Sequence, residues 1–323
     1  MPTAGSNVEF LVGTYTRNTV SEGIYRVEFD EHTGVLREPV LALRADNPSF
    51  LVADERTLFV ANEIGDAELG GEITVFDRSR QKLDLAQVVA SHGKDPCHLA
   101  LSDTHLAVAN YSGGTVALFK REQSKLADDP KIIRHTKRGP HTRQKNPHPH
   151  GVYFIETSLW VTDLGGDCLE QYDLSGDHQA TWETEAGAGP RHLSGDGRYL
   201  VNELNNTVHD RDDGRKVLCV PDGWEEDSIA AEIVATNGMV YVSNRGHDTI
   251  AVLNTTPALE LVDYFDTGGA HPRHFVVTPE GQWLLVANKD TSNLTALPIL
   301  TDGTLGEIAD SVVCPSPTCI LPI

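Results

Sequence analysis

One short phrase returns seven times along this chain and constrains its fold more than any other feature. Its copies are VGTY at Val12, VANE at Val60, VANY at Val108, VTDL at Val161, VNEL at Val201, VSNR at Val242 and VANK at Val286. Successive copies lie 40 to 53 residues apart, and turn residues separate the short apolar runs between them. Four short strands per repeat of this length are typical of β-propeller blades. We therefore predict an all-β, seven-bladed β-propeller of four-stranded antiparallel blades.

The two ends of the chain predict how such a ring closes. The chain opens on EFLVGTYT, which has the place of a second strand, and stops after PTCILPI, which has the place of a first strand. The C-terminal strand would then complete the N-terminal blade and remove its open edge. Because no linker interrupts the repeats, residues 1–323 are predicted to form a single domain.

Charge and cysteine usage exclude several classes of protein. The chain has 47 acidic against 26 basic residues, a net charge of −21, which disfavours nonspecific binding to nucleic acid or anionic membranes. We find no apolar run long enough to span a membrane and no signal-peptide pattern. The five cysteines are scattered, which predicts free thiols in a reducing compartment: Cys97, Cys168, Cys219, Cys314 and Cys319. We expect a cytoplasmic monomer or weak homodimer.

Polar side chains recur where first strands begin and second strands end, and these points share one face of an antiparallel blade. The predicted strand starts carry His98, His148, His150, Arg191, His192, Arg273 and His274. The predicted strand ends carry Glu63, Asn110, Tyr111, Asp163, Asp167, Glu203, Asn244, Arg245, His247 and Asn288. The opposite turns carry ordinary turn residues. This asymmetry predicts a functional site on one face, near the mouth of the axial channel.

A basic segment interrupts the acidic chain in the longest repeat. No acid occurs between Asp129 and Glu156, whereas Lys131, Arg134, Lys137, Arg138, Arg143 and Lys145 do. The segment either focuses the electrostatic field on an anionic ligand or is a solvated loop with incidental charge.

The motifs, taken in order, resemble the seven-bladed propeller lactonase family. They are VGTYT, NPSFLV, VANE, DPCHLAL, VANYSGGTVALF, RQ-x-x-PHPHG, DLGGD, GAGPRHL, VNEL, VSNRGHDTIAVL and HPRHFVV. The resemblance spans essentially the whole chain. The family includes propeller-type 6-phosphogluconolactonases and fungal carboxy-muconate lactonising enzymes. It implies a site built from His148 or His150, Arg191, Glu203, and Arg245 or Arg273.

Lactone hydrolysis needs a base for water, donors for the oxyanion and a proton for the leaving alkoxide. We predict catalytic roles for His148, Arg191, Glu203 and Arg245. Predicted substrate-binding residues are Arg143, His150, His192, Arg273, His247 and Asp163. Either Glu203 or His148 could transfer the proton, while the guanidinium of Arg191 suits the oxyanion.

Each of these residues also has a structural interpretation. Glu203 and Arg191 could form an ion pair between blades, and His98 and His274 could dock neighbouring blades. Asn110, Asn244 and Asn288 suit turns, Tyr111 suits packing, and Asp163 and Asp167 face the channel or cap the DLGGD turn.

We predict no cofactor and no metal. DLGGD lacks the ligand spacing of a calcium loop, and His148-x-His150 lacks a third ligand at a diagnostic spacing. The predicted reaction is metal-independent hydrolysis of a small anionic lactone, with 6-phosphogluconolactone as the first candidate. The alternatives are a lactonising isomerase acting on a muconate-type diacid and a non-catalytic propeller that binds a ligand or protein.

Overall fold

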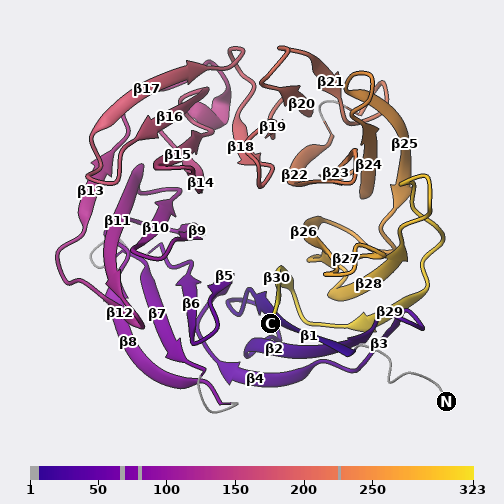
Figure 1. The fold of residues 1–323 in the computed structure, drawn as a ribbon, viewed down its shortest axis with the longest axis horizontal. Helices are drawn as coiled ribbons and strands as arrows, with labels where there is room; N and C mark the ends of the chain where they lie inside the picture. The colour runs from indigo at the N-terminus through magenta and orange to yellow at the C-terminus, as the bar shows by residue number, and fades with distance from the viewer. Residues whose placement is uncertain (1–6, 66–69, 79–81, 225–226) are drawn as a thin grey trace. The chain divides into compact units, whose positions relative to one another are not determined.

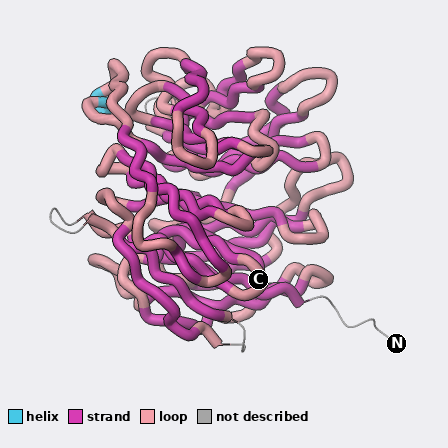
Figure 2. Tube along the Cα trace, turned by 60° about the vertical axis from the view of Figure 1, so that its left-hand side comes forward, coloured by secondary structure: helices cyan, strands magenta, loops and turns pink. Residues whose placement is uncertain are grey.

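Strands dominate the structure, a computed structural model that describes residues 7–65, 70–78, 82–224 and 227–323. Figure 2 shows strands joined by loops, and the helical part of the described chain is one short 3-10 helix, η1 (Thr142–Gln144). The described strands form seven antiparallel sheets, as the seven repeats predict. Contacts divide the chain into two units, Asn47–Asn205 and the remainder. The single domain over residues 1–323 stays a prediction.

The unit Asn47–Asn205 contains three complete sheets and a terminal strand pair (Figure 1). The first sheet holds β5 (Pro48–Ala53), β6 (Thr57–Asn62), β7 (Glu72–Asp77) and β8 (Asp84–Ala90). The second holds β9 (Pro96–Leu101), β10 (His105–Asn110), β11 (Thr115–Glu122), β12 (Lys125–Leu126) and β13 (Lys131–Arg134). The third holds β14 (Pro149–Ile155), β15 (Ser158–Asp163), β16 (Cys168–Tyr172) and β17 (His178–Glu183). The terminal pair is β18 (Pro190–Leu193) and β19 (Tyr199–Asn202).

The other unit contains both ends of the chain. Its closing sheet holds β1 (Asn7–Thr14), β2 (Gly23–Asp30), β3 (Val35–Leu36), β4 (Val40–Arg44) and β30 (Pro317–Pro322). A short pair holds β20 (Thr207–Asp210) and β21 (Lys216–Leu218). The next sheet holds β22 (Ile229–Thr236), β23 (Met239–Arg245), β24 (Thr249–Asn254) and β25 (Glu260–Asp266). The last holds β26 (Pro272–Val277), β27 (Trp283–Asn288), β28 (Asn293–Pro298) and β29 (Asp310–Val313).

Apolar layers between neighbouring sheets form the core of each unit. Phe59 and Ile73 of one sheet meet Leu99 and Phe119 of the next. Along the same unit, the first strands contact in the order β5, β9, β14, β18. Each sheet thus buries both faces between its neighbours, which explains why the middle strands are apolar on successive residues rather than alternating.

The pairing registers place the start of each first strand beside the end of each second strand. Asn110 lies opposite Pro96, and Asn202 lies opposite Pro190. The copy of the repeat written as VNEL is therefore shifted by one residue, because Asn202 and not Glu203 takes the place of Asn110. Glu203 instead takes the place of Tyr111, the first residue beyond the strand.

Asparagines at three strand ends tie a sheet to the sheet before it within the same unit. Asn110 Nδ2 donates to the carbonyl of Ser91 at 2.8 Å, just after the preceding outer strand. Asn244 and Asn288 make the same bond, to the carbonyls of Cys219 and Thr267. The sequence suggested that these three residues form turns, whereas in the structure their side-chain amides join neighbouring sheets.

The C-terminal strand closes the first sheet as predicted. β30 pairs with β1, with Val12 opposite Ile320, and both residues belong to one buried apolar cluster with Phe10 and Leu285. The pairing covers the edge of β1.

We predict that a chain ending at Ser316 will unfold at a much lower temperature or fail to fold. Burial of Ile320 alone contributes about 1.5–3 kcal/mol, against a total stability of about 5–15 kcal/mol for a typical domain. Thermal unfolding followed by circular dichroism tests this. A chain ending at Pro322, which loses only a partly exposed residue, should unfold like the full chain. Equal unfolding temperatures for all three would show that closure by β30 is unimportant.

Candidate active site

Bulges at the starts of two strands direct polar side chains at one end of the unit Asn47–Asn205. The pairing register shifts just after the first proline of β14 and of β18. The bulged residues are His150 and Arg191. Because a β-bulge re-aims a side chain away from the regular ladder, this explains why polar residues follow the proline in PHPHG and GAGPRHL.

The carboxylate of Glu203 lies between two guanidiniums. Arg143 Nη1 is 2.5 Å from Glu203 Oε1, and Arg191 Nε is 3.0 Å from Oε2. Glu203 is 1% exposed and the Arg191 side chain 3%, whereas the Arg143 side chain is 40% exposed. Arg191 and Glu203 come from one strand pair, β18 and the residue after β19, so their ion pair lies within a sheet and not between sheets.

Arg143 also joins Tyr111 to this carboxylate. Its Nη2 donates to the Tyr111 hydroxyl at 3.1 Å. Burial by itself would lower the pKa of Arg143, but the charge of Glu203 and the bonds to both partners raise it, so the guanidinium stays protonated. Burial raises the pKa of Tyr111, which keeps the phenol neutral. Tyr111 therefore holds a cation in place, beyond the packing role expected of it.

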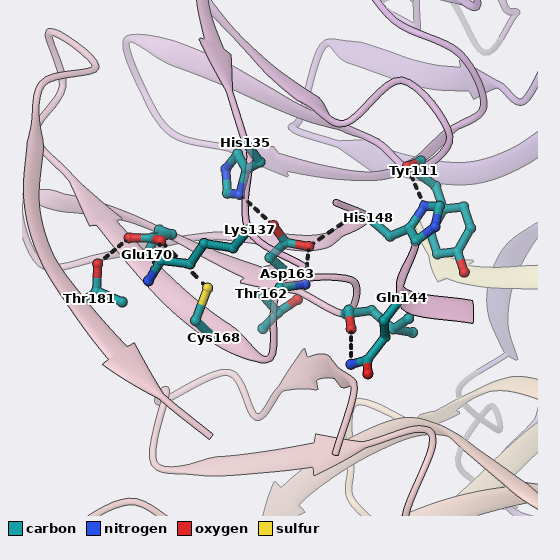
Figure 3. Close-up of polar contacts among 12 residues, drawn as sticks. Tyr111, His135, Lys137, Gln144, His148, Thr162, Asp163, Cys168, Glu170 and Thr181 are labelled. Carbon is teal, nitrogen blue, oxygen red and sulfur yellow. Dashed lines mark hydrogen bonds and ion pairs between the residues drawn. The ribbon is translucent and has the colours of Figure 1, made fainter. Parts of the chain in front are cut away.

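His148 is held in one tautomer against Tyr111. Its Nδ1 lies 2.9 Å from the carbonyl oxygen of Tyr111, and the two rings stack at 4.3 Å with an interplanar angle of 17° (Figure 3). A carbonyl oxygen only accepts a hydrogen bond, so Nδ1 carries a hydrogen, and the tautomer with this hydrogen has a lone pair at Nε2. This is the arrangement required of a general base.

Asp163 positions the backbone of His148. Its Oδ1 accepts the backbone N–H of His148 at 2.8 Å and that of Gly166 at 3.0 Å. Its Oδ2 pairs with His135 Nδ1 at 2.9 Å (Figure 3). Asp163 is 0% exposed. These three contacts orient the backbone around His148. Substrate binding by Asp163 stays a prediction, and its complete burial favours a positioning role.

Gln144 and Asp167 tie the basic segment to GAGPRHL. Gln144 Nε2 donates to the carbonyl of Leu164 at 2.8 Å and to Asp167 Oδ1 at 2.5 Å. The two oxygens of Asp167 accept the N–H groups of Gly187 and Gly189 at 2.7 and 2.8 Å. Asp167 thus caps the loops rather than facing a ligand. Sequence reasoning missed Gln144, although it stands beside Arg143 in the RQ pair.

Buried histidines form a cluster beside these groups. The His192 ring meets the rings of His98 and His150 edge-on, at 4.9 and 5.0 Å. His98 Nδ1 accepts the N–H of Val152 in the next sheet at 3.3 Å, and His274 likewise accepts the N–H of Ile320. The docking role predicted for His98 and His274 is confirmed. Substrate binding by His150 and His192 stays a prediction, and their burial favours an orienting role.

Acids outside the basic segment neutralise part of its charge. Lys137 Nζ lies 2.7 Å from Glu183 and 3.3 Å from Glu170, and Lys131 pairs with Asp177. Lys131 and Lys137 are therefore held in ion pairs, and Arg143 reaches Glu203. That the segment focuses the electrostatic field on an anionic ligand stays a prediction.

Two further predicted arginines lie in the other unit. Arg245 Nη2 donates to the carbonyl of Ala230 at 2.8 Å, and the Arg273 guanidinium lies 5.1 Å from the centre of the Tyr15 ring. Burial, then the charges of Arg245 and Lys289, hold the pKa of His271 well below its ordinary value. Asp290, whose Oδ2 lies 3.4 Å from His271 Nδ1, acts in the opposite direction. Catalysis by Arg245 and substrate binding by Arg273 stay predictions.

His247, in the same unit, lies among aromatic rings. Its ring meets Trp224 and Tyr264 edge-on at 4.8 and 5.6 Å, and its Nδ1 is 2.7 Å from Thr249 Oγ1. Burial lowers the pKa of His247. Its predicted contact with substrate stays a prediction.

Among the residues that the structure describes, no group of three or more His, Cys, Asp or Glu side chains is arranged to hold a metal ion. All five cysteines are buried free thiols, as predicted. None of the helical structure within the described ranges has the length and apolarity needed to cross a bilayer.

Comparison with known proteins identifies the fold and family. The family model described as "Lactonase, 7-bladed beta-propeller" matches residues 9–322. A 6-phosphogluconolactonase of Bacillus subtilis is 32% identical, over 96% of this chain and 96% of that protein. A periplasmic gluconolactonase of Pseudomonas aeruginosa superposes with a TM-score of 0.89 at 30% identity, covering 98% and 99% of the two chains. A protein of Lactobacillus plantarum superposes with a TM-score of 0.88 at 28% identity, and the match covers 98% of this chain and 100% of that one.

Seven antiparallel sheets, each of four or five described strands, and this family match define a seven-bladed β-propeller enzyme. The chain belongs to the lactonase family of seven-bladed β-propellers, which confirms the resemblance found in its motifs. The family match also runs without interruption across both units.

We predict that Asp163→Ala will lower the free energy of unfolding by about 3–5 kcal/mol, because it leaves a buried histidine and two N–H groups without their carboxylate. Denaturant unfolding measures this. The control is Asp177→Ala, which removes an exposed pair with Lys131 and should change stability by less than about 1 kcal/mol. Similar values for both variants would contradict the positioning role of Asp163.

Proposed function

We propose that this chain hydrolyses the ester bond of a sugar-acid lactone without a metal, and that 6-phosphogluconolactone is its substrate. The observation that carries the proposal is the buried Glu203 carboxylate between Arg143 and Arg191, linked through Tyr111 to the oriented imidazole of His148. The Bacillus subtilis relative supports this substrate.

His148 acts as the base in the proposed mechanism. Its Nε2 removes a proton from water while the water oxygen attacks the lactone carbonyl carbon. The resulting oxyanion is stabilised by the guanidinium of Arg191, whose charge is permanent and which Glu203 holds in place. When the ring carbon–oxygen bond breaks, the imidazolium returns the proton to the leaving alkoxide. The products are a hydroxy acid and the neutral imidazole.

Glu203 is assigned the role of organising the arginines rather than that of the base. Its burial and its two ion pairs support this choice, because a carboxylate bound on both oxygens by guanidiniums is a weak proton acceptor. His148 Nε2 has no hydrogen-bond partner among the described residues.

Cytoplasmic location and a monomeric or weakly dimeric state are part of the proposal. Buried reduced thiols support a reducing compartment. The Pseudomonas aeruginosa relative is periplasmic, so cell fractionation is the appropriate test of location.

We expect purified protein to open δ-gluconolactone 6-phosphate in the presence of a chelator. His148→Asn should lower kcat by about 10²- to 10⁴-fold, because the base is lost. Glu203→Gln should also lower kcat, because the arginines lose their organising charge. The matched control is His32→Asn, the same substitution at an exposed histidine in a turn, which should leave the rate unchanged.

Three outcomes would overturn the proposal. Loss of activity with chelator alone would contradict metal independence. Cyclisation of a muconate-type diacid without lactone opening would favour the isomerase. Binding of a ligand or protein with no turnover, unaffected by Glu203→Gln, would favour the non-catalytic propeller.

A further inference from the structure

Arg143 is displayed from a fixed piece of backbone. It lies in η1, where the N–H of Arg143 donates to His141 Nδ1 and the N–H of His141 donates to Gln144 Oε1. The Gln144 side chain is 0% exposed and is bonded to Leu164 and Asp167. The buried glutamine anchors the turn, and the neighbouring arginine projects from it. An anchored turn lowers the entropy lost when its side chain binds a ligand.

The fork of Arg143 is only partly used. Its Nη1 pairs with Glu203 and its Nη2 donates to Tyr111, whereas a guanidinium has five N–H donors. The side chain is 40% exposed, so part of it is accessible to solvent. Arg191, on the same carboxylate, has a side chain that is only 3% exposed. Of these two guanidiniums, Arg143 is the one that a bulky anion can reach.

The setting of Arg143 favours an anion. Its charge stands in a stretch of sequence without acids, on a protein whose net charge is −21. Neighbouring Lys131 and Lys137 are paired with acids of β17 and its surroundings. A planar guanidinium binds phosphate or carboxylate through two parallel hydrogen bonds.

We propose that Arg143 selects lactones that carry an anionic substituent outside the ring, by binding a phosphate or carboxylate with its guanidinium. The selection rests on the proposed lactone hydrolysis. Because the same guanidinium pairs with Glu203, any effect of Arg143 on the reacting centre is shared by all lactones. The choice between anionic and neutral lactones therefore isolates substrate recognition from catalysis.

The test compares kcat/KM for δ-gluconolactone 6-phosphate, carboxylate-bearing glucaro-δ-lactone and neutral δ-gluconolactone. In Arg143→Gln, the ratio of each anionic lactone to the neutral one should fall about 10- to 100-fold, the value of a charge-assisted hydrogen bond. Arg143→Lys, which keeps the charge but not the fork, should give a smaller fall. A fall for both anions indicates recognition of charge in general, and a fall for the phosphate alone indicates a phosphate site.

The matched control is Arg138→Gln, which removes an equal charge from an exposed arginine of the same segment. Its ratio should match that of the unmodified protein. An unchanged ratio in Arg143→Gln, or an equal fall in Arg138→Gln, would overturn the proposal while leaving lactone hydrolysis intact. If no lactone is opened, the proposed function fails. Calorimetric binding of 6-phosphogluconate then tests whether Arg143 recognises the anion. Weaker binding to Arg143→Gln supports anion recognition, and equal binding overturns it.

Discussion

The arrangement of sheets within each unit depends on a hydrogen bond between a strand-end asparagine and the sheet before it. A sheet with two apolar faces is stable only between neighbours, so its position must be set by contacts outside its own ladder. Asn110, Asn244 and Asn288 supply that contact from buried amides. Because the amide fixes the strand end, the next residue along the chain emerges at a defined place. Tyr111 and Glu203 occupy that place in two sheets.

In the sheet β14–β17, the residue at the end of the second strand is a carboxylate, Asp163, and it has a different role. Asp163 stands at the position that Asn110 and Asn288 occupy in two other sheets. The amide nitrogen donates a hydrogen bond there, whereas a carboxylate can only accept one. It therefore takes the His135 side chain, from the residue after the preceding outer strand, and the backbone N–H of His148. In this sheet the residue at the strand end therefore positions His148, the candidate base. The nearby Asp167 joins the η1 turn to GAGPRHL in the same manner.

Predictions from sequence were most accurate where the repeat governs structure. The seven sheets, the closing strand and the docking histidines His98 and His274 follow from periodicity, because every repeat must solve the same packing problem. The misaligned copy at Val201 shows the limit of this reasoning. There, valine and asparagine are adjacent, and only the pairing of Asn202 with Pro190 sets the register.

The sequence by itself determined the class of fold, the family and the set of polar residues at the strand ends, because these depend on local pattern and its repetition. Tertiary structure alone decided which of those residues meet. Arg143 belongs to an irregular segment with no period, so nothing in the chain predicts that its guanidinium reaches Tyr111 and Glu203. The burial of Asp163 could not be predicted either. The exposure of a side chain depends on which residues from distant parts of the chain pack over it, and the spacing of motifs does not give these contacts.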